Sequence, residues 1–397
     1  MQPTPNRGEH SRSYLPGALL HGVPTFILTG VALSLSVSTG TCGEHPQDGG
    51  VPNVVLILTD DQGYGDLSCH GNPVLKTPYL DKLHDESVRL VDFHVAPMCT
   101  PTRSELLTGT AALRNGACCA CSGRTFTRRG LPTMPEIFAR SGYRTAIFGK
   151  WHLGDNYPHR PEDRGFQRTV YHLGWGITST PDYFNNDYFD DFFRTDGALK
   201  HFPGYCTDVW FNQAMQWIEE RRKAGEPFFV YLSTNAPHGP FFAPEEYKEP
   251  YKHLDRDTAG FFAMVANIDH NVARLDEMLE ATGLRENTLL IFMTDNGGTG
   301  GIKVYNAGMR GAKASLYEGG HRVPCFIRWP RGGLRAPGDV GAMVHVTDLL
   351  PTLVDLCGLK SLSEKGSAPL NRGGLTPFRI TIEPCVVNDR IHSGSFA

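Results

Sequence analysis

Short, continuous apolar runs alternate along this chain with longer amphipathic stretches. The clearest runs share a length of four or five residues without a charged interruption, and they lie at 54–58, 145–148, 228–232, 289–293 and 323–327. Such runs are typical of strands that are buried on both faces, as in a parallel sheet. The alternation therefore predicts an α/β domain with a mainly parallel central sheet flanked by helices.

Apolar residues at three- and four-residue spacing predict the helices of this domain. The predicted ranges are 77–87, 103–113, 133–141, 207–223, 258–281 and 346–357. In the second of these, Leu106, Leu107 and Leu113 are expected to form one buried stripe. Pro324 lies inside the last apolar run and predicts a peripheral strand, since proline cannot donate a hydrogen bond to a neighbouring strand.

Segment 155–205 is rich in Asp, Tyr, Phe and Gly and has no clean hydrophobic period. We interpret it as a long excursion from the sheet that shapes a substrate pocket.

Composition and the N-terminal pattern narrow the class of protein. The 397 residues are 40% hydrophobic, which is enough for one large domain, and the formal net charge of −4 argues against a nucleic-acid partner. Arg7 and Arg12 precede a mainly apolar stretch that ends in small residues near position 41. This layout predicts a signal peptide over residues 1–42, or an N-terminal membrane anchor if it stays uncleaved, followed by a linker at 43–52. The chain is therefore expected to be exported, to a periplasmic, secreted or lumenal location.

Polar side chains follow several predicted strands where each strand ends. Asp60 and Asp61 follow 54–58, and Asp295 and Asn296 follow 289–293. Ligands in such sheets bind beyond the carboxyl ends of the strands, so we expect these four side chains to share one rim. Their oxygens are hard ligands that suit Ca²⁺ or Mg²⁺ and not Zn²⁺, and a cation would relieve the repulsion between adjacent carboxylates. Turn or N-cap residues are the alternative interpretation of either pair alone.

A second set of polar residues joins the same rim. Lys150 and His152 follow the strand at 145–148, and His238 follows the strand at 228–232. The segment Cys99-Thr100-Pro101-Thr102-Arg103 opens the helix predicted at 103–113, because proline suits the first turn of a helix. Cys99 is thus expected at a helix N-terminus with Arg103 one turn away, an arrangement that favours an anion.

These motifs resemble the type I sulfatases of the alkaline phosphatase superfamily, whose signature is C-x-P-x-R. The likeness extends over residues 53–358, which we interpret as the catalytic domain. Its landmarks occur in the family's order: Asp61-Gln62-Gly63-Tyr64-Gly65-Asp66, Gly149-Lys150-Trp151-His152, Ala236-Pro237-His238, Thr294-Asp295-Asn296-Gly297, Arg310-Gly311-Ala312-Lys313 and Tyr317-Glu318-Gly319-Gly320.

The resemblance implies a nucleophile made after synthesis. A formylglycine-generating or other sulfatase-maturing enzyme would oxidise Cys99 to formylglycine, and a hydroxyl of its hydrate would attack the sulfur of a sulfate ester. The implied ligands of Ca²⁺ or Mg²⁺ are Asp60, Asp61, Cys99, Asp295 and Asn296. Asp295 would take the proton of the attacking hydroxyl while it remains a ligand.

The resemblance also implies roles for the basic residues. Lys150 and Lys313 would neutralise charge on the sulfate, and Arg103 would orient the hydrate. His152 would act as the base that regenerates the aldehyde, and His238 would protonate the leaving alcohol or hold the sulfate. The implied substrate is a sulfated small molecule or polysaccharide, with a carbohydrate sulfate or an aryl sulfate both open.

Three other functions remain open from the residues alone. A phosphoester hydrolase would use the same metal-bearing sheet, although Cys99 stands where the related phosphatases use serine or threonine. A cysteine hydrolase would use Cys99 as a thiolate. That mechanism needs no metal ion, so it gives the four predicted oxygen ligands no function.

The third alternative is an inactive binding protein. The resemblance fades after Leu359, whereas sulfatases continue into a smaller C-terminal domain. We therefore expect that domain to be largely missing, with 359–397 a divergent, truncated tail.

Overall fold

The computed structural model describes residues 50–120, 125–179 and 182–360, which include the whole predicted catalytic domain apart from two short gaps. The predicted leader at 1–42 and almost all of the tail predicted at 359–397 lie outside the described residues. Within the described ranges, no helix is long and apolar enough to cross a membrane.

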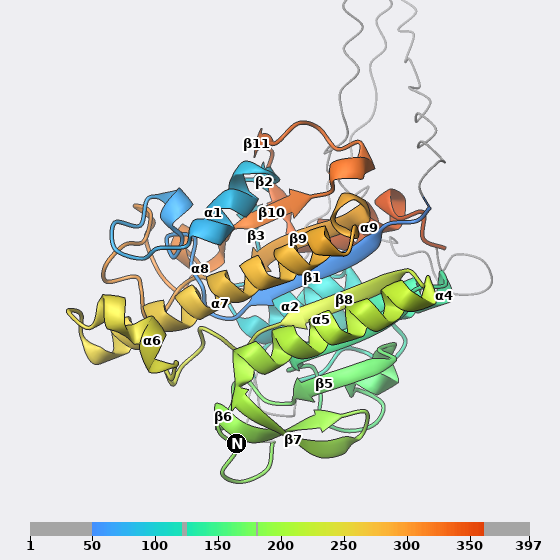
Figure 1. Cartoon of the computed structure of the whole chain (residues 1–397), viewed down its shortest axis with the longest axis horizontal. Helices are drawn as coiled ribbons and strands as arrows, with labels where there is room; N and C mark the ends of the chain where they lie inside the picture. Colours follow the sequence, from blue (N-terminus) through green and yellow to red (C-terminus); the bar gives the residue numbers. More distant parts are fainter. Residues whose placement is uncertain (1–49, 121–124, 180–181, 361–397) are drawn as a thin grey trace, which may run out of the picture. The chain divides into compact units, whose positions relative to one another are not determined.

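A ten-stranded sheet of order β11-β2-β10-β9-β1-β8-β4-β5-β6-β7 organises the domain (Figure 1). Its five central strands are mutually parallel. They are β9 (Thr288–Thr294), β1 (Asn53–Thr59), β8 (Phe228–Ser233), β4 (Arg144–Lys150) and β5 (Arg168–His172). This confirms the predicted α/β class and four of the five predicted strands.

The strand predicted at 323–327 is present, but its predicted peripheral place was wrong. It is β10 (Cys325–Arg328), and it pairs antiparallel with β9 on one side and with β2 (Val88–Leu90) on the other. Pro324 lies just before the first residue of β10, so it removes no hydrogen bond from either neighbour. The short β11 (Gly338–Val340) then forms the edge beside β2.

The interpretation of 155–205 as an excursion from the sheet was also wrong. The segment contains β5 and the antiparallel strands β6 (Phe189–Thr195) and β7 (Ala198–Tyr205), which complete the other edge. Most residues of β7 are exposed on both faces, and the hydrophobic alternation of a half-buried strand is therefore missing there.

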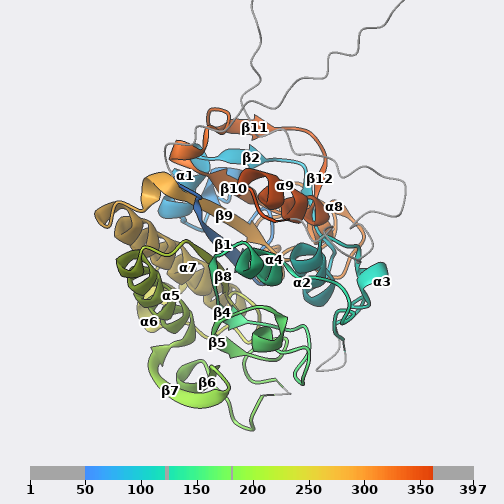
Figure 2. The same cartoon turned by 90° about the vertical axis from the view of Figure 1, so that its right-hand side faces the viewer.

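Helices cover both faces of the sheet (Figure 2). One layer contains α1 (Pro78–Asp85), α5 (Cys206–Ala224) and α7 (Arg256–Ala281), and the other contains α2 (Cys99–Thr108), α4 (Met134–Arg140) and α9 (Leu349–Leu356). Successive residues of β1 point to opposite faces, so Val55 and Ile57 pack with the first layer while Leu56 and Leu58 pack with the second. Both faces are buried, which explains why the β1 sequence is continuously apolar.

The helix predicted at 103–113 is shorter and starts earlier. It begins at Cys99 and ends at Thr108, because Gly109 adopts a left-handed conformation with φ of 58°. Leu113 belongs to a separate turn, α3 (Ala112–Asn115), and is exposed, so it is not part of the buried stripe.

The remaining elements are short. They are the helices α6 (Glu245–Lys248) and α8 (Glu318–His321), the paired strands β3 (Phe93–His94) and β12 (Val344–His345), and the 3₁₀ turns η2 (Ser68–His70), η3 (Pro161–Arg164), η4 (Glu249–Tyr251), η5 (Arg285–Asn287), η6 (Pro330–Gly332) and η7 (Val346–Asp348).

Candidate active site

Carboxylates from the ends of β1 and β9 meet the N-terminus of α2. Thr59 and Thr294 are partners in the β1–β9 pairing, which brings Asp60 and Asp295 side by side directly after them. The Cys99 sulfur and one carboxylate oxygen from each aspartate all lie within 4.8 Å of one another. Cys99 is only 1% exposed, so its sulfur is buried in this cluster.

Three cationic side chains face three carboxylates in this cluster. Lys150 Nζ lies 2.5 Å from Asp60 Oδ2, and Lys313 Nζ lies 2.6 Å from Asp61 Oδ1. Burial disfavours the charged form of Lys313, but Asp61 and Asp60 outweigh this and raise its pKa above the usual value. Each lysine thus forms an ion pair with one of two adjacent aspartates.

Arg103 makes the densest set of contacts. Its Nε and Nη2 donate to Asp295 Oδ2 at 3.0 and 2.7 Å, and its Nη1 donates to Ser233 Oγ. Burial disfavours the charged form of Arg103, but the charge of Asp295 outweighs this effect and raises the pKa of the guanidinium above its usual value. The guanidinium therefore stays protonated. Arg103 therefore fixes Asp295 relative to the end of β8.

The two predicted histidines lie on different sides of the cluster. His152 Nδ1 is 3.3 Å from Cys99 Sγ, and burial followed by the charges of Lys150 and Arg103 lowers the pKa of His152 well below its usual value. His238 Nε2 lies 3.8 Å from Asp61 Oδ2, and the ring is more exposed. His152 is therefore neutral and next to the sulfur, while His238 faces the carboxylate beyond it.

Two unpaired oxygens test whether a metal ion fits this cluster. Asp60 Oδ1 and Asn296 Oδ1 are buried and accept no hydrogen bond from the described residues, while Asn296 Nδ2 donates to Asp61 Oδ1 at 2.9 Å. Burial and the nearby Asp60 also raise the pKa of Asp295. Unsatisfied oxygens and crowded carboxylates are costly without a cation. The residues therefore fit a hard divalent cation, whose ligands prefer to be oxygens.

Two glycines, Gly149 and Gly297, allow the backbones of the site's loops to approach closely. Gly149 has φ of 110°, and a Cβ there would lie 1.9 Å from the carbonyl oxygen of Ser233. A Cβ on Gly297 would lie 1.8 Å from the carbonyl oxygen of Gly319, and Gly297 N donates to Gly320 O at 2.9 Å. The segment 317–320 thus packs directly against Gly297, the residue that follows Asp295 and Asn296.

Three further residues of the site escaped the sequence analysis. Ser233 accepts from Arg103, Thr100 Oγ1 lies 3.1 Å from His152 Nδ1, and His172 ends β5 in register with Lys150. Both ring nitrogens of His172 are buried without a hydrogen-bond partner among the described residues. Only two consecutive apolar residues, Val170 and Tyr171, precede His172, so β5 lacks the longer apolar run that predicted the other strands.

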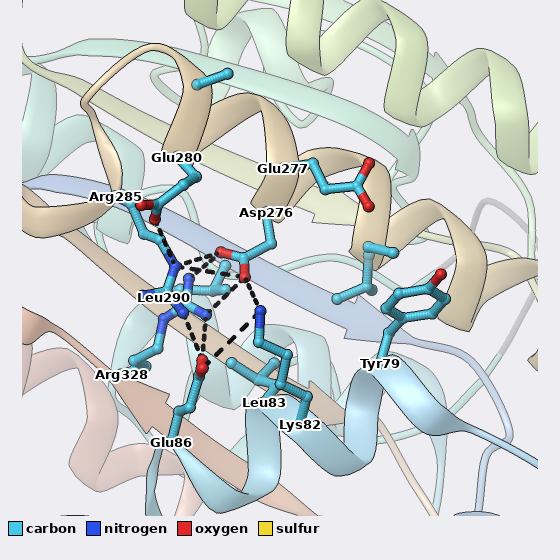
Figure 3. Close-up of a pocket in the computed structure, with 13 residues that line it drawn as sticks. Tyr79, Lys82, Leu83, Glu86, Asp276, Glu277, Glu280, Arg285, Leu290 and Arg328 are labelled. Carbon is cyan, nitrogen blue, oxygen red and sulfur yellow. Dashed lines mark hydrogen bonds and ion pairs between the residues drawn. The ribbon is translucent and has the colours of Figure 1, made fainter.

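A cavity of about 490 Å³ lies elsewhere, between α1 and α7, and none of the predicted site residues lines it (Figure 3). Most of its charged side chains pair with one another. Arg285 lies 2.5 Å from Glu86 and 3.2 Å from Asp276, and Arg328 contacts the same two carboxylates. The arginine charges are already paired, so we assign no chemistry to this cavity.

A family model described as Sulfatase matches residues 52–359. The chain belongs to the sulfatase family. It is 32% identical over 320 residues to arylsulfatase J of Mus musculus, covering 77% of this chain and 52% of that protein. It is 30% identical over 343 residues to the N-acetylgalactosamine-6-sulfatase of the same species, covering 79% and 64%. This sulfatase chain therefore spans between half and two thirds of the length of these relatives.

Solved structures agree with this assignment. Ps i-CgsB, solved in complex with k-i-k-neocarrahexaose, superposes with a TM-score of 0.73 at 28% identity, covering 78% of this sulfatase chain and 72% of that one. The phosphonate monoester hydrolase of Agrobacterium radiobacter superposes with a TM-score of 0.56 at 21% identity, covering 78% and 74%, which shows a shared fold. These neighbours support the alkaline phosphatase-like architecture expected from the sequence.

Proposed function

We propose that this chain hydrolyses sulfate esters at Cys99 after its oxidation to formylglycine, with Ca²⁺ or Mg²⁺ held by Asp60, Asp61, Asp295, Asn296 and residue 99. The observation that carries the proposal is the position of the Cys99 sulfur at a helix N-terminus, within 4.8 Å of Asp60 and Asp295 oxygens. Membership of the sulfatase family supports the reaction class.

The formylglycine hydrate would supply a nucleophilic hydroxyl, and the divalent cation would supply charge that polarises the sulfate. The oxygens available to that cation include Asp60 Oδ1 and Asn296 Oδ1, the two that accept no hydrogen bond from the described residues. The remaining tasks belong to the side chains around them.

The basic residues would bind and orient the sulfate. Lys150 and Lys313 place two ammonium groups beside Asp60 and Asp61, where they would balance charge that develops on the transferring group. Arg103 holds Asp295 through two hydrogen bonds to one oxygen, which leaves Asp295 Oδ1 facing the backbone of Asp61 at 3.1 Å. We propose that Asp295 accepts the proton of the attacking hydroxyl.

The histidines would handle the other two protons. His152 is neutral and lies 3.3 Å from the sulfur, so it would accept a proton from residue 99 when the aldehyde is regenerated. His238 is more exposed and presents Nε2 toward the site, so it would donate a proton to the leaving oxygen. The two rings differ in burial and in the group that each faces, which supports this division of roles.

We propose a sulfated carbohydrate as the substrate class. N-acetylgalactosamine-6-sulfatase is named for a sulfated sugar, and Ps i-CgsB was solved with k-i-k-neocarrahexaose. Exposed aromatic residues, including Trp175 and Phe242, offer faces on which sugar rings pack. A formylglycine-generating or other maturing enzyme would be an obligatory partner. Export, as a periplasmic, secreted or lumenal protein, is part of the same proposal.

The decisive experiment is mass spectrometry of the tryptic peptide that contains Cys99. Conversion of the thiol to the aldehyde lowers the peptide mass by about 18 Da. We expect this loss in protein from the native host, together with hydrolysis of an aryl sulfate that Cys99→Ala abolishes. Cys118→Ser, at an exposed cysteine, is the matched control and should keep the activity.

An aryl phosphate assayed beside the aryl sulfate separates the two ester classes. An unmodified thiol in active protein, or phosphate hydrolysis that exceeds sulfate hydrolysis, would overturn the proposal.

A further inference from the structure

We propose that this chain carries a second metal site, for Zn²⁺, formed by Cys69, His70 and His84. One ligand atom from each of these residues lies within 4.8 Å of those of the other two. Cys69 and His70 belong to η2, and His84 lies in the last turn of α1. None of the three is a residue of the candidate active site.

The hydrogen bonds of the two imidazoles orient both rings for ligation. His70 Nδ1 lies 2.7 Å from the carbonyl oxygen of Tyr64, and His84 Nδ1 lies 2.8 Å from Asp85 Oδ1. A carbonyl oxygen can only accept, so Nδ1 of His70 carries the proton, and a carboxylate oxygen of Asp85 is the acceptor that faces Nδ1 of His84. Each ring therefore keeps its Nε2 lone pair for a metal, in the arrangement in which metal-binding histidines donate their other nitrogen to an oxygen.

Ring packing holds His70 in that orientation. It stacks on Tyr64 with 3.9 Å between ring centroids, and it meets His84 edge-on at 5.9 Å. Phe326 contacts both imidazoles from the side of the sheet. Neighbouring rings thus hold both imidazoles in place.

The donor types select the metal. One thiolate and two imidazoles suit Zn²⁺, whereas the oxygens of the active site suit Ca²⁺ or Mg²⁺. Ligand atoms in a tetrahedral zinc site lie about 3.5 Å apart, so the three ligand atoms, now within 4.8 Å of one another, would have to approach each other by at most about 1.3 Å. His84 is partly exposed, which gives a water molecule access to the fourth position.

Asp81 supports the cysteine side of this cluster. Its Oδ1 accepts from Cys69 N at 2.8 Å, and its Oδ2 accepts from Ser68 Oγ at 2.7 Å, which fixes η2 against α1. On binding, the S–H bond breaks, its proton leaves to solvent, and the sulfur electron pair forms the bond to Zn²⁺.

The site would act as a clip between two elements. The loop that carries Asp60 and Asp61 runs through Asp66 into η2, while α1 packs against α7 on the face of the sheet. A zinc ion bound to both η2 and α1 would tie the end of this loop to the helical layer.

Cobalt spectroscopy of the full-length protein tests the site, because tetrahedral Co²⁺ bound to a thiolate absorbs strongly. The reduced protein is first saturated with Ca²⁺ and then titrated with Co²⁺. We expect about one equivalent to bind with a thiolate-to-cobalt charge-transfer band that Zn²⁺ removes. Cys69→Ser should abolish the band, and His84→Ala should weaken zinc binding at least about tenfold in competition with a chromogenic chelator.

Two controls make the result specific. Cys118→Ser, at an exposed cysteine outside the cluster, should keep the band. A band that persists in Cys69→Ser but disappears in Cys99→Ala would place the metal in the active site and overturn the proposal, as would the absence of any band in the wild-type protein. His84→Ala changes a partly exposed side chain, so the test stands even if Cys69→Ser fails to fold. The readout does not depend on sulfate hydrolysis, so it also stands if the proposed function fails.

Discussion

Arg103 shows how one buried side chain holds the candidate active site together. It is fully buried, it donates twice to Asp295, and it also reaches Ser233 at the end of β8. A buried charge is tolerated when its partners satisfy it, and removal of one partner leaves the other charge exposed to a low dielectric. The geometry of Asp295 thus depends on Arg103 as much as on β9.

We therefore expect Arg103→Met to lower the free energy of unfolding by about 3–5 kcal/mol, since Asp295 would remain beside Asp60 without its cation. Urea unfolding followed by circular dichroism, at a fixed Ca²⁺ concentration, measures the change. Adding Asp295→Asn to Arg103→Met should recover part of the loss, because the unpaired charge is then removed. If the double variant is as unstable as the sum of the two single variants, the two residues are not coupled and this account is wrong.

At the scale of elements, the site depends on how closely β4 approaches β8. Gly149 allows this approach, since the space for its Cβ is occupied by the Ser233 carbonyl. Gly149 is the register partner of Ser233, so Lys150 lies one residue beyond the end of β8, where it contacts Asp60 while Ser233 accepts from Arg103. A larger residue would separate the strands at the point where they supply the site.

The substitution Gly149→Ala tests this dependence. We expect a loss of unfolding free energy at least about 2 kcal/mol greater than that of Gly197→Ala, because overpacking adds to the cost of a positive φ. Gly197 is the matched control: its φ is 89° and a Cβ there would meet nothing within 4 Å. Thermal unfolding of both variants gives the comparison, and equal losses would rule out the proposed close contact.

The predictability of each element follows from what surrounds it. The strands β1, β8 and β9 are buried on both faces, so their sequences are uniformly apolar and were predicted nearly to their ends. The hairpin of β6 and β7 is largely solvent-exposed and has no such signal. The early stop of α2 depends on the left-handed Gly109, which a periodicity argument overlooks.

The site residues divide in the same way. Residues directly after predicted strands, such as Asp60 and Asp295, were found because parallel strands end at one rim. His172 is the last residue of a strand that was not predicted, and Thr100 and Ser233 have side chains too common to stand out. Their contacts with His152 and Arg103 depend on packing between segments far apart in the chain, which no local pattern encodes.

Over the whole molecule, buried titratable groups link stability to pH. Asp269, in the middle of α7, is 3% exposed and accepts hydrogen bonds from the backbone N–H groups of Tyr79 and Leu80 at the start of α1. Burial raises the pKa of Asp269 to about 7 despite these hydrogen bonds. The folded protein therefore binds a proton here more tightly than the unfolded chain does.

The sign of the effect follows from linkage. The contribution of the protonated Asp269 is complete below about pH 4, the usual pKa of an unfolded aspartate, and is lost as the pH rises through about 7. Its size is on the order of a few kcal/mol. Asp269→Asn keeps an oxygen acceptor for α1 and should remove this decline between pH 4 and 7.

Chemical unfolding of wild-type protein and Asp269→Asn at several pH values measures the difference. Asp257→Asn, at an exposed position of the same helix, should retain the wild-type slope. Parallel curves for wild type and Asp269→Asn would show that this carboxyl does not titrate in the expected range.

The burial of Cys99 also imposes an order of events. In the folded chain Cys99 is 1% exposed, and its sulfur lies at the carboxyl ends of the central strands, next to Asp60, Asp295 and His152. Another protein cannot bring its own catalytic groups to an atom so enclosed. The oxidation that we propose must therefore occur on the newly made chain, before α2 docks against the sheet. Folding and maturation then compete in time, and a chain that folds first would keep its thiol permanently.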